Sequence, residues 1–296
     1  MKNKKPTVAL FGNTFQIKKN QCVVDVIRLL RLQHINICIE RKFADFIAAS
    51  HQLDLSDCSI IGTQGDFTAD VAFSMGGDGT FLGTAARIGR KGIPILGINT
   101  GHLGFLADVS PDGIGEAVDS VLSGKYIIEQ RSLIHVTKNG KPLTTYPYAL
   151  NEIAVLKHDN SSLIEIRTHI DGNHLTNYQA DGLIVCTPTG STGYSLSTGG
   201  PIIVPQSGTF CLSAVAPHSL NIRPVILCDN VGITLEVYSR SHNFLISIDG
   251  RSESFPDGTV ISLRKADYTI GVIKIKHKHF FDTLKEKMMW GIDPRF

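Results

Sequence analysis

The chain has 296 residues, of which 42% are hydrophobic and 19% are charged. This composition provides enough hydrophobic residues to form buried cores and excludes a disordered protein. The length predicts two domains. A formal net charge of +2 gives no reason to expect a nucleic-acid or membrane partner. Because no secretory signal is visible and no apolar run approaches the ~20 residues that cross a bilayer, we expect a cytoplasmic protein.

The first part of the chain alternates short apolar runs with segments of helical periodicity. Val23, Val26, Ile27 and Leu30, for example, fall on one helical face. Such alternation predicts βαβ units, and therefore a parallel sheet with helices on its faces. We expect strands at 7–13, 35–40, 69–75 and 93–99, and helices at 21–33, 41–50, 80–89 and 114–124.

After Tyr126 the pattern changes to short β-branched or alternating runs separated by Asn-Gly and Asp-Gly turn signals. This pattern is typical of hairpins or stacked sheets. The predicted fold class is therefore an α/β N-terminal domain with a parallel sheet, residues 1–125, followed by a β-rich C-terminal domain, residues 126–276. The pattern of residues 277–296 predicts a helix that can pack back on the first domain.

A glycine-rich turn follows the expected strand at 69–75. In "VAFSMGGDGTFLG" (71–83), Gly76, Gly77 and Gly79 surround Asp78. Glycines adopt backbone angles that other residues avoid, and they let a ligand approach the main chain. Ligands of parallel sheets bind beyond the carboxyl ends of the strands. The turn is thus a candidate ligand site, although Asp-Gly pairs also form ordinary turns.

The β-rich part holds a segment of unusual composition, "DGLIVCTPTGSTGYSLSTGGPI" (181–202). Its hydroxyl groups and uncovered amides suit a polyhydroxylated or phosphorylated ligand, and Tyr194 offers a flat face for a base. A Ser/Gly loop without a ligand is the alternative. Asn151 and Glu152 stand in an apolar strand, where such groups are costly unless paired or functional. Asp249, in "SIDGRSESF", reads as a turn residue.

Several nucleotide and hydrolase motifs are missing from the sequence. It contains no Walker GxxxxGK[ST], no GxGxxG after the first strand, and neither GxSxG nor HExxH. The six cysteines lack the spacing of zinc ligands. These absences leave a P-loop, a Rossmann hydride-transfer site and a zinc centre unsupported.

Taken in order, the motifs resemble those of bacterial NAD kinases. The matching stretches are "GGDGT" (76–80), "LGFL" (103–106), "NE" (151–152), the segment 181–202, "APHSLNIRPVIL" (216–227) and "SIDGR" (247–251). Lipid kinases and phosphofructokinases have similar glycine–acid loops, so the long Thr/Ser/Gly segment is the specific part. The resemblance implies transfer of the γ-phosphoryl group of ATP to the 2′-hydroxyl of the adenosine ribose of NAD.

The resemblance also implies roles for individual residues. Asp78 is expected to be the general base for the ribose hydroxyl, or to orient it. The turn formed by Gly76, Gly77, Gly79 and Thr80 is expected to cradle phosphates. The residues expected to bind NAD are Asp78, Gly79, Asn151, Glu152, Gln179, Asp181, Thr192, Gly193, Tyr194, Ser195, Leu196, Ser197 and Arg251.

Two positions depart from the family pattern. Gln179 stands where some relatives carry a basic residue, which weakens the expectation of a cationic contact to the NAD phosphates. Gly193 stands where many relatives carry alanine. The resemblance further implies a divalent metal, Mg²⁺ arriving with ATP, and a homodimer or homotetramer. The alternatives are a lipid kinase with a GGDGT loop and a non-catalytic nucleotide-binding protein.

Overall fold

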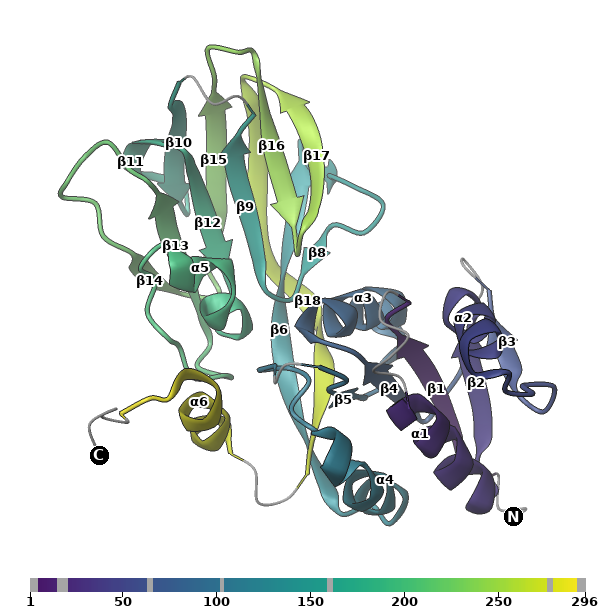
Figure 1. Cartoon of the computed structure of the whole chain (residues 1–296). Coiled ribbons are helices and arrows are strands. Elements are labelled where there is room, and N and C mark those ends of the chain that lie inside the picture. The colour runs from purple at the N-terminus through teal and green to yellow at the C-terminus, as the bar shows by residue number, and fades with distance from the viewer. Residues whose placement is uncertain are drawn as a thin grey trace. The chain divides into compact units, whose positions relative to one another are not determined.

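The computed structural model describes residues 5–14, 21–62, 66–101, 104–158, 162–275 and 279–291. Leu103 of the "LGFL" motif, and residues 277, 278 and 292–296 of the C-terminal segment, lie outside the described residues. The chain divides into two compact units (Figure 1). The first combines Met1–Gln130 with Ile270–Phe296, and the second is Arg131–Thr269.

The first unit is built on a parallel sheet. Its strands lie in the order β5-β4-β1-β2-β3, and the last part of β18 pairs with β5 through Val272 and Ile95. The elements are β1 (Thr7–Gly12), α1 (Gln21–Leu32), β2 (Asn36–Glu40), α2 (Arg41–His51), β3 (Ser59–Ile61), β4 (Val71–Met75), α3 (Asp78–Ile88), η2 (Gly89–Lys91), β5 (Ile95–Ile98), η3 (Pro111–Gly113), α4 (Ile114–Leu122) and α6 (Phe280–Met288).

Helices cover both faces of this sheet. Successive side chains of a strand point to opposite faces. Phe73 and Met75 of β4 join a core with apolar residues of α1 and α4. The hydroxyl of Ser74, between them, accepts a 3.0 Å hydrogen bond from the hydroxyl of Thr84 of α3. The helix α3, which directly follows the glycine-rich turn, therefore lies on the face opposite α1 and α4.

The second unit contains two stacked antiparallel sheets. One has the order β11-β10-β15-β18, with β6 against β18 and the short β7 and β8 against β6, and the other has the order β14-β13-β12-β9-β16-β17. The strands are β6 (Tyr126–Lys138), β7 (Lys141–Pro142), β8 (Tyr148–Ala149), β9 (Glu152–Lys157), β10 (Ile164–Ile170), β11 (Asn173–Ala180), β12 (Gly182–Cys186), β13 (Thr209–Val215), β14 (Val225–Cys228), β15 (Ile233–Tyr238), β16 (Asn243–Ile248), β17 (Arg251–Pro256) and β18 (Thr259–Ile275). Strands β6 and β18 each begin in one unit and end in the other.

The two faces of β12 have different partners. Leu183 and Val185 belong to the core between the two sheets. Ile184 and Cys186 point to the other side, where they form a smaller cluster with Ile203. The Thr/Ser/Gly-rich segment after β12 carries η4 (Thr189–Thr192) and α5 (Tyr194–Ser197). Ile203, the residue that follows this segment, therefore packs on the outer face of the second sheet.

The predicted fold class is confirmed, with three differences in detail. The helix after the glycine-rich turn begins at Asp78 rather than at Thr80. Strand β3 was not expected, and its three residues are too few to show a periodic pattern. The Thr/Ser/Gly-rich segment is partly helical. None of the described helices is long and apolar enough to span a membrane.

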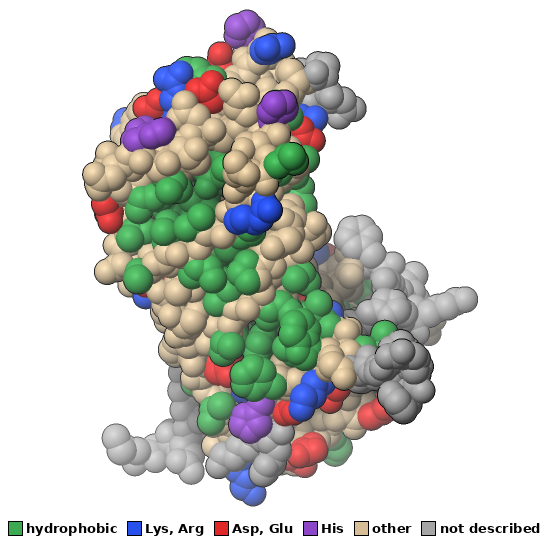
Figure 2. All heavy atoms as spheres, turned by 90° about the vertical axis from the view of Figure 1, so that its left-hand side faces the viewer, with side chains coloured by type: hydrophobic (Ala, Val, Ile, Leu, Met, Phe, Trp, Pro, Cys, Tyr) green, Lys and Arg blue, Asp and Glu red, His purple; other side chains and the backbone are tan. Residues whose placement is uncertain are grey.

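Some large apolar side chains of the second unit remain on the surface. Val204, Leu220 and Ile226 are 47%, 87% and 50% exposed. Figure 2 shows hydrophobic side chains gathered on the side of this unit that carries β11, β13 and β14. Large exposed apolar patches on folded proteins mark interaction sites.

Candidate functional site

Asp78 begins α3, and its carboxylate binds a second loop of the first unit. The main-chain N–H of Phe105 donates to Oδ2 at 3.0 Å, and those of Leu106 and Ala107 donate to Oδ1 at 3.0 and 3.1 Å. The Nζ atom of Lys287, from α6, lies 3.6 Å from Oδ2. The carboxylate is thus held in one orientation at the carboxyl end of β4.

The glycines near Asp78 matter because they lack side chains. A Cβ on Gly104 would overlap Oδ1 of Asp78, and a Cβ on Gly76 would overlap the hydroxyl of Thr80. Added Cβ atoms on Gly77 and Gly79 would meet nothing within 4 Å among the described residues, so none of these covers the main chain there. None of Gly76, Gly77 and Gly79 adopts a left-handed φ. The expectation that unusual backbone angles require these glycines is therefore wrong, whereas the absence of side chains at Gly77 and Gly79 leaves room for a ligand at the main chain.

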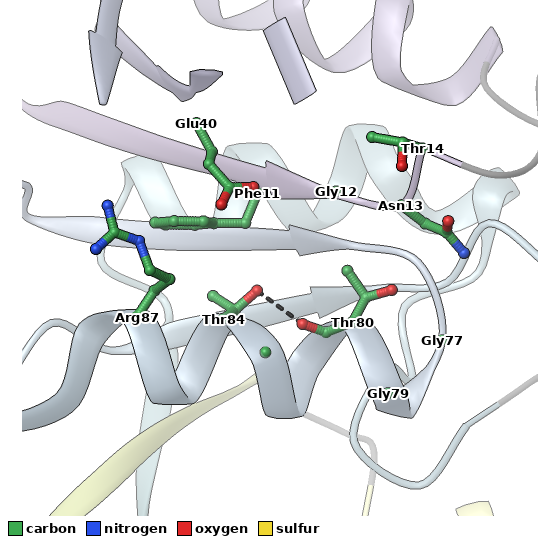
Figure 3. Close-up of a pocket in the computed structure, with 11 residues that line it drawn as sticks. Phe11, Gly12, Asn13, Thr14, Glu40, Gly77, Gly79, Thr80, Thr84 and Arg87 are labelled. Carbon is green, nitrogen blue, oxygen red and sulfur yellow. Dashed lines mark hydrogen bonds between the residues drawn. The ribbon is translucent and has the colours of Figure 1, made fainter. Parts of the chain in front are cut away.

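A cavity of about 480 Å³ opens beside this turn. In Figure 3, Thr80, Thr84 and Arg87 approach it from α3, while Phe11 and Glu40 lie across from them. The residues that line it are Phe11, Gly12, Asn13, Thr14, Glu40, Gly77, Gly79, Thr80, Gly83, Thr84 and Arg87. The carboxyl ends of β1, β2 and β4 all reach this cavity, which is where ligands of parallel sheets bind.

In the second unit, Asp249 organises the segment before β9. Its Oδ2 accepts the main-chain N–H of Leu150 at 2.8 Å, and its Oδ1 accepts those of Asn151 and Glu152 at 2.8 and 3.1 Å. Asp249 stands in the β16–β17 turn with a left-handed φ of 47°, as its interpretation as a turn residue predicts. The hydrogen bonds to residues 150–152 were missed, because no local pattern reports a contact so distant in sequence.

Asn151 and Glu152 carry buried oxygen atoms without a hydrogen-bond partner among the described residues. These atoms are Oδ1 of Asn151 and Oε2 of Glu152. Burial, and then the nearby charge of Asp249, raise the pKa of Glu152 to about 7, while a hydrogen bond from the main-chain N–H of Tyr194 opposes the shift. Burial also raises the pKa of Asp249. Three main-chain N–H groups favour a negative charge on Asp249, so the proton of this pair rests on Glu152.

The Thr/Ser/Gly-rich segment approaches the same two residues. A Cβ on Gly193 would lie 3.0 Å from Oε2 of Glu152 and 3.4 Å from Nδ2 of Asn151. A Cβ on Gly190 would overlap the main-chain carbonyl oxygen of Asn151. Tyr194 is 40% exposed. The structure therefore brings together Asn151, Glu152, Gly193 and Tyr194, four of the residues predicted to bind NAD.

The hydroxyl groups of this segment mostly form hydrogen bonds with other groups of the protein. Ser195 is fully buried, and its Oγ lies 3.1 Å from Oγ of Ser213. The hydroxyls of Thr192 and Ser197 donate to the carbonyl oxygens of Thr189, at 3.4 Å, and of Tyr194, at 2.8 Å. The helical turns η4 and α5 are thus fixed by their own side chains, while Leu196 is partly exposed.

Three other predicted NAD residues have separate surroundings. Gln179 lines a second cavity, of about 470 Å³, together with Glu165, Tyr238 and Arg240. The Asp181 carboxylate pairs with Lys157 at 2.7 Å. The Arg251 guanidinium donates to the carbonyl oxygens of Ile248 and Tyr148, at 3.0 and 2.9 Å.

Comparison with known proteins agrees with these observations. The model of the ATP-NAD kinase N-terminal domain matches residues 9–126, and that of the C-terminal domain matches residues 150–275. The chain belongs to the NAD kinase family. The NAD kinase of Bacteroides fragilis is 53% identical over 287 residues, 97% of this chain and 99% of that protein. The NAD kinase of Porphyromonas gingivalis is 42% identical over 284 residues, 96% and 98% of the two chains.

Two solved structures share the fold. A crystal structure of yeast NADH kinase complexed with NADH superposes with a TM-score of 0.86 at 22% identity, covering 99% of this chain and 89% of the other. A crystal structure of an NAD kinase from Archaeoglobus fulgidus in complex with ATP gives a TM-score of 0.77 at 23% identity, covering 96% and 98%. These structures show the fold, while the two family models and the bacterial relatives confirm the sequence-based prediction of an ATP-dependent NAD kinase.

Proposed function

We propose that this NAD kinase transfers the γ-phosphoryl group of ATP to the 2′-hydroxyl of the adenosine ribose of NAD, giving NADP and ADP. The observation that carries the proposal is the Asp78 carboxylate, which the amides of 105–107 hold in place. Its neighbours in the chain, Gly77 and Gly79, line the cavity beside α3. A ribose hydroxyl is a poor acid, so a fixed carboxylate orients it and accepts its proton late in the transfer. Positioning supplies much of the remaining catalysis of phosphoryl transfer.

The cavity beside α3 is proposed to hold the ATP. The N–H groups of the first turn of a helix lack acceptors within the helix and attract anions. The uncovered main chain at Gly77 and Gly79 supports a phosphate cradle there, together with Gly76 and the hydroxyl of Thr80. The aromatic ring of Phe11, at the other end of the cavity in Figure 3, is proposed to contact the adenine.

A divalent metal ion is proposed to arrive with the ATP. Within the described ranges, no group of three His, Cys, Asp or Glu side chains is placed to hold a metal. Mg²⁺ needs only one or two carboxylates when phosphates and water supply its other ligands. Glu40 brings one carboxylate to the cavity wall. The residues present therefore fit Mg²⁺ bound to ATP, whose charge the ion would neutralise.

In the second unit, NAD is proposed to bind at the segment that Asp249 organises. Oδ1 of Asn151 and Oε2 of Glu152, which have no hydrogen-bond partner in the part of the chain that the structure describes, suit ribose hydroxyls or the amino group of adenine. A protonated Glu152 can also donate a hydrogen bond. The exposed ring of Tyr194 supports base stacking. Further contacts are proposed for Gly79, Gln179, Asp181, Thr192, Gly193, Ser195, Leu196, Ser197 and Arg251.

The apolar surface of the second unit supports the expected homodimer or homotetramer. Val204, Leu220 and Ile226 are the exposed residues that self-association would bury. Light scattering after size-exclusion chromatography tests this part, with Ile226→Glu as the variant. We expect an oligomer for the wild type and a lower mass for the variant. A monomeric wild type would contradict the proposal.

The function is tested by incubating the protein with NAD, ATP and Mg²⁺ and measuring NADP with an NADP-specific dehydrogenase. Parallel reactions contain NADH, or a diacylglycerol in detergent micelles, as the acceptor. We expect NADP from NAD. Phosphorylation of the lipid alone would favour a lipid kinase, and nucleotide binding without any transfer would favour a non-catalytic protein.

A further inference from the structure

The C-terminal helix α6 places a cation beside Asp78. The Nζ atom of Lys287 lies 3.6 Å from Oδ2 of Asp78 and 4.6 Å from the centroid of the Phe105 ring. Phe105 is also the residue whose main-chain N–H donates to the same carboxylate oxygen. Lys287 therefore contacts both Asp78 and the loop that holds it.

The position of Lys287 is set by the way α6 is anchored. A capping box joins His279 and Asp282 at the start of the helix. Thr283 and Leu284 are buried, and the ring of Phe280 lies 6.2 Å from that of Phe105. A lysine in the last turn is also favoured by the helix dipole. The helix thus presents Lys287 at a defined place, with 30% of its side chain exposed.

A phosphoryl group in transit to a hydroxyl at Asp78 meets an electrostatic difficulty. It carries negative charge and must come close to a carboxylate, which repels it. Around Asp78, the partners within the described residues are the neutral N–H groups of 105–107 and a single cation, Lys287. Lysine binds phosphate as a point charge, and its three N–H donors can serve the carboxylate and a phosphate at once.

We propose that Lys287 binds the phosphoryl group as it reaches the ribose hydroxyl and then contacts the 2′-phosphate of NADP. This inference rests on the proposed function. In the step, the 2′-oxygen forms a bond to the γ-phosphorus of ATP, and the bond from that phosphorus to the β–γ bridging oxygen breaks. The electron pair of the broken bond leaves on ADP, and the hydroxyl proton passes to Asp78. Lys287 keeps its protons throughout and stabilises the charge on the transferred group.

The test compares Lys287→Ala and Lys287→Arg with the wild type, using Lys285→Ala as the control. Lys285 stands in the same turn of α6 and is exposed. We expect Lys287→Ala to lower kcat by about 10²-fold, Lys287→Arg to recover most of the loss, and Lys285→Ala to match the wild type. The melting temperatures of all four proteins are measured alongside, so that a loss of folding is detected.

The affinities for NAD and NADP, measured by calorimetry without ATP, separate phosphate binding from a structural role. The two ligands differ only by the 2′-phosphate. We expect Lys287→Ala to weaken NADP binding by about tenfold, in keeping with a lost charge-assisted contact, and to leave NAD binding within about twofold. Equal losses for both ligands, or wild-type kcat in Lys287→Ala, would overturn the inference. A wild type that forms no NADP would instead overturn the proposed function.

Discussion

The Asp249 carboxylate accepts the main-chain N–H of Glu152 at 3.1 Å, and the same oxygen accepts that of Asn151 at 2.8 Å. A turn residue between β16 and β17 thereby fixes the segment that leads into β9. Asp78 does the same in the first unit, where its carboxylate binds the amides of 105–107. In each unit, one aspartate holds three successive main-chain N–H groups.

Replacing Asp249 by asparagine tests this relationship. Asparagine keeps the shape of the side chain, but its amide nitrogen is a hydrogen-bond donor. It therefore cannot replace the carboxylate oxygen that accepts a main-chain N–H group. We expect Asp249→Asn to lower the free energy of unfolding by about 1–3 kcal/mol and to raise the KM for NAD more than the KM for ATP. Urea denaturation and steady-state kinetics provide the two measurements. An equal rise in both KM values would argue against a local role at Asn151 and Glu152.

The raised pKa of Glu152 predicts a pH dependence of stability. Its carboxyl group titrates near pH 7 in the folded protein and near 4.5 in the unfolded chain. Between these values the folded state binds more protons, so the free energy of unfolding falls as pH rises. Glu152→Gln has no carboxyl group at this position and so removes the loss. As the pH rises from 4.5 to 8, we expect its free energy of unfolding to increase by about 2–3 kcal/mol relative to that of the wild type.

Urea denaturation of both proteins across that pH range measures the difference. Glu253→Gln, at an exposed position of β17, is the matched control and should follow the wild type. Parallel pH profiles for the wild type and Glu152→Gln would contradict the assignment of the proton to Glu152.

Two glycines of the Thr/Ser/Gly-rich segment form a second matched pair. A Cβ on Gly190 would overlap the carbonyl oxygen of Asn151, and main chain cannot move aside cheaply. A Cβ on Gly193 would lie 3.0 Å from Oε2 of Glu152, at the end of a side chain, and 3.2 Å from the carbonyl oxygen of Gly190, which is a tight fit without overlap. We expect Gly190→Ala to cost about 2–4 kcal/mol of stability and Gly193→Ala less than about 1 kcal/mol. Thermal unfolding of both variants measures the two losses of stability. Similar losses would contradict the packing described around these glycines.

Gly104 offers a way to displace the Asp78 carboxylate without changing Asp78. The Cβ of Gly104→Ala would overlap Oδ1, and the aspartate side chain must rotate away from the amides of 105–107. We expect a fall in kcat of about 10²-fold with the fold retained. Gly113→Ala is the control, because its Cβ would make only an ordinary 3.4 Å contact with Ser110. Full activity of Gly104→Ala would show that the observed carboxylate orientation is not required.

The sequence predicted those parts of the fold whose signals are local. Apolar periodicity gave α1 and α4, and the glycine-rich turn was placed correctly between a strand and a helix. The role of Asp249 could not be predicted, because its hydrogen bonds join residues that the chain separates widely. The contact of Lys287 with Asp78 could not be predicted either. In the sequence Lys287 belongs to an ordinary charged helix, and only tertiary packing places its side chain near Asp78. The cavity walls at Phe11 and Glu40 come from strand ends that carry no motif.

The most direct test of the account is the rate of NADP formation by Asp78→Asn. Asn keeps the size of the side chain and loses the proton acceptor. We predict a fall in kcat of about 10²-fold or more, with the wild-type rate retained by Asp112→Asn, an exposed control in η3. Turnover of Asp78→Asn at the wild-type rate would contradict the role of this carboxylate, and with it the central claim.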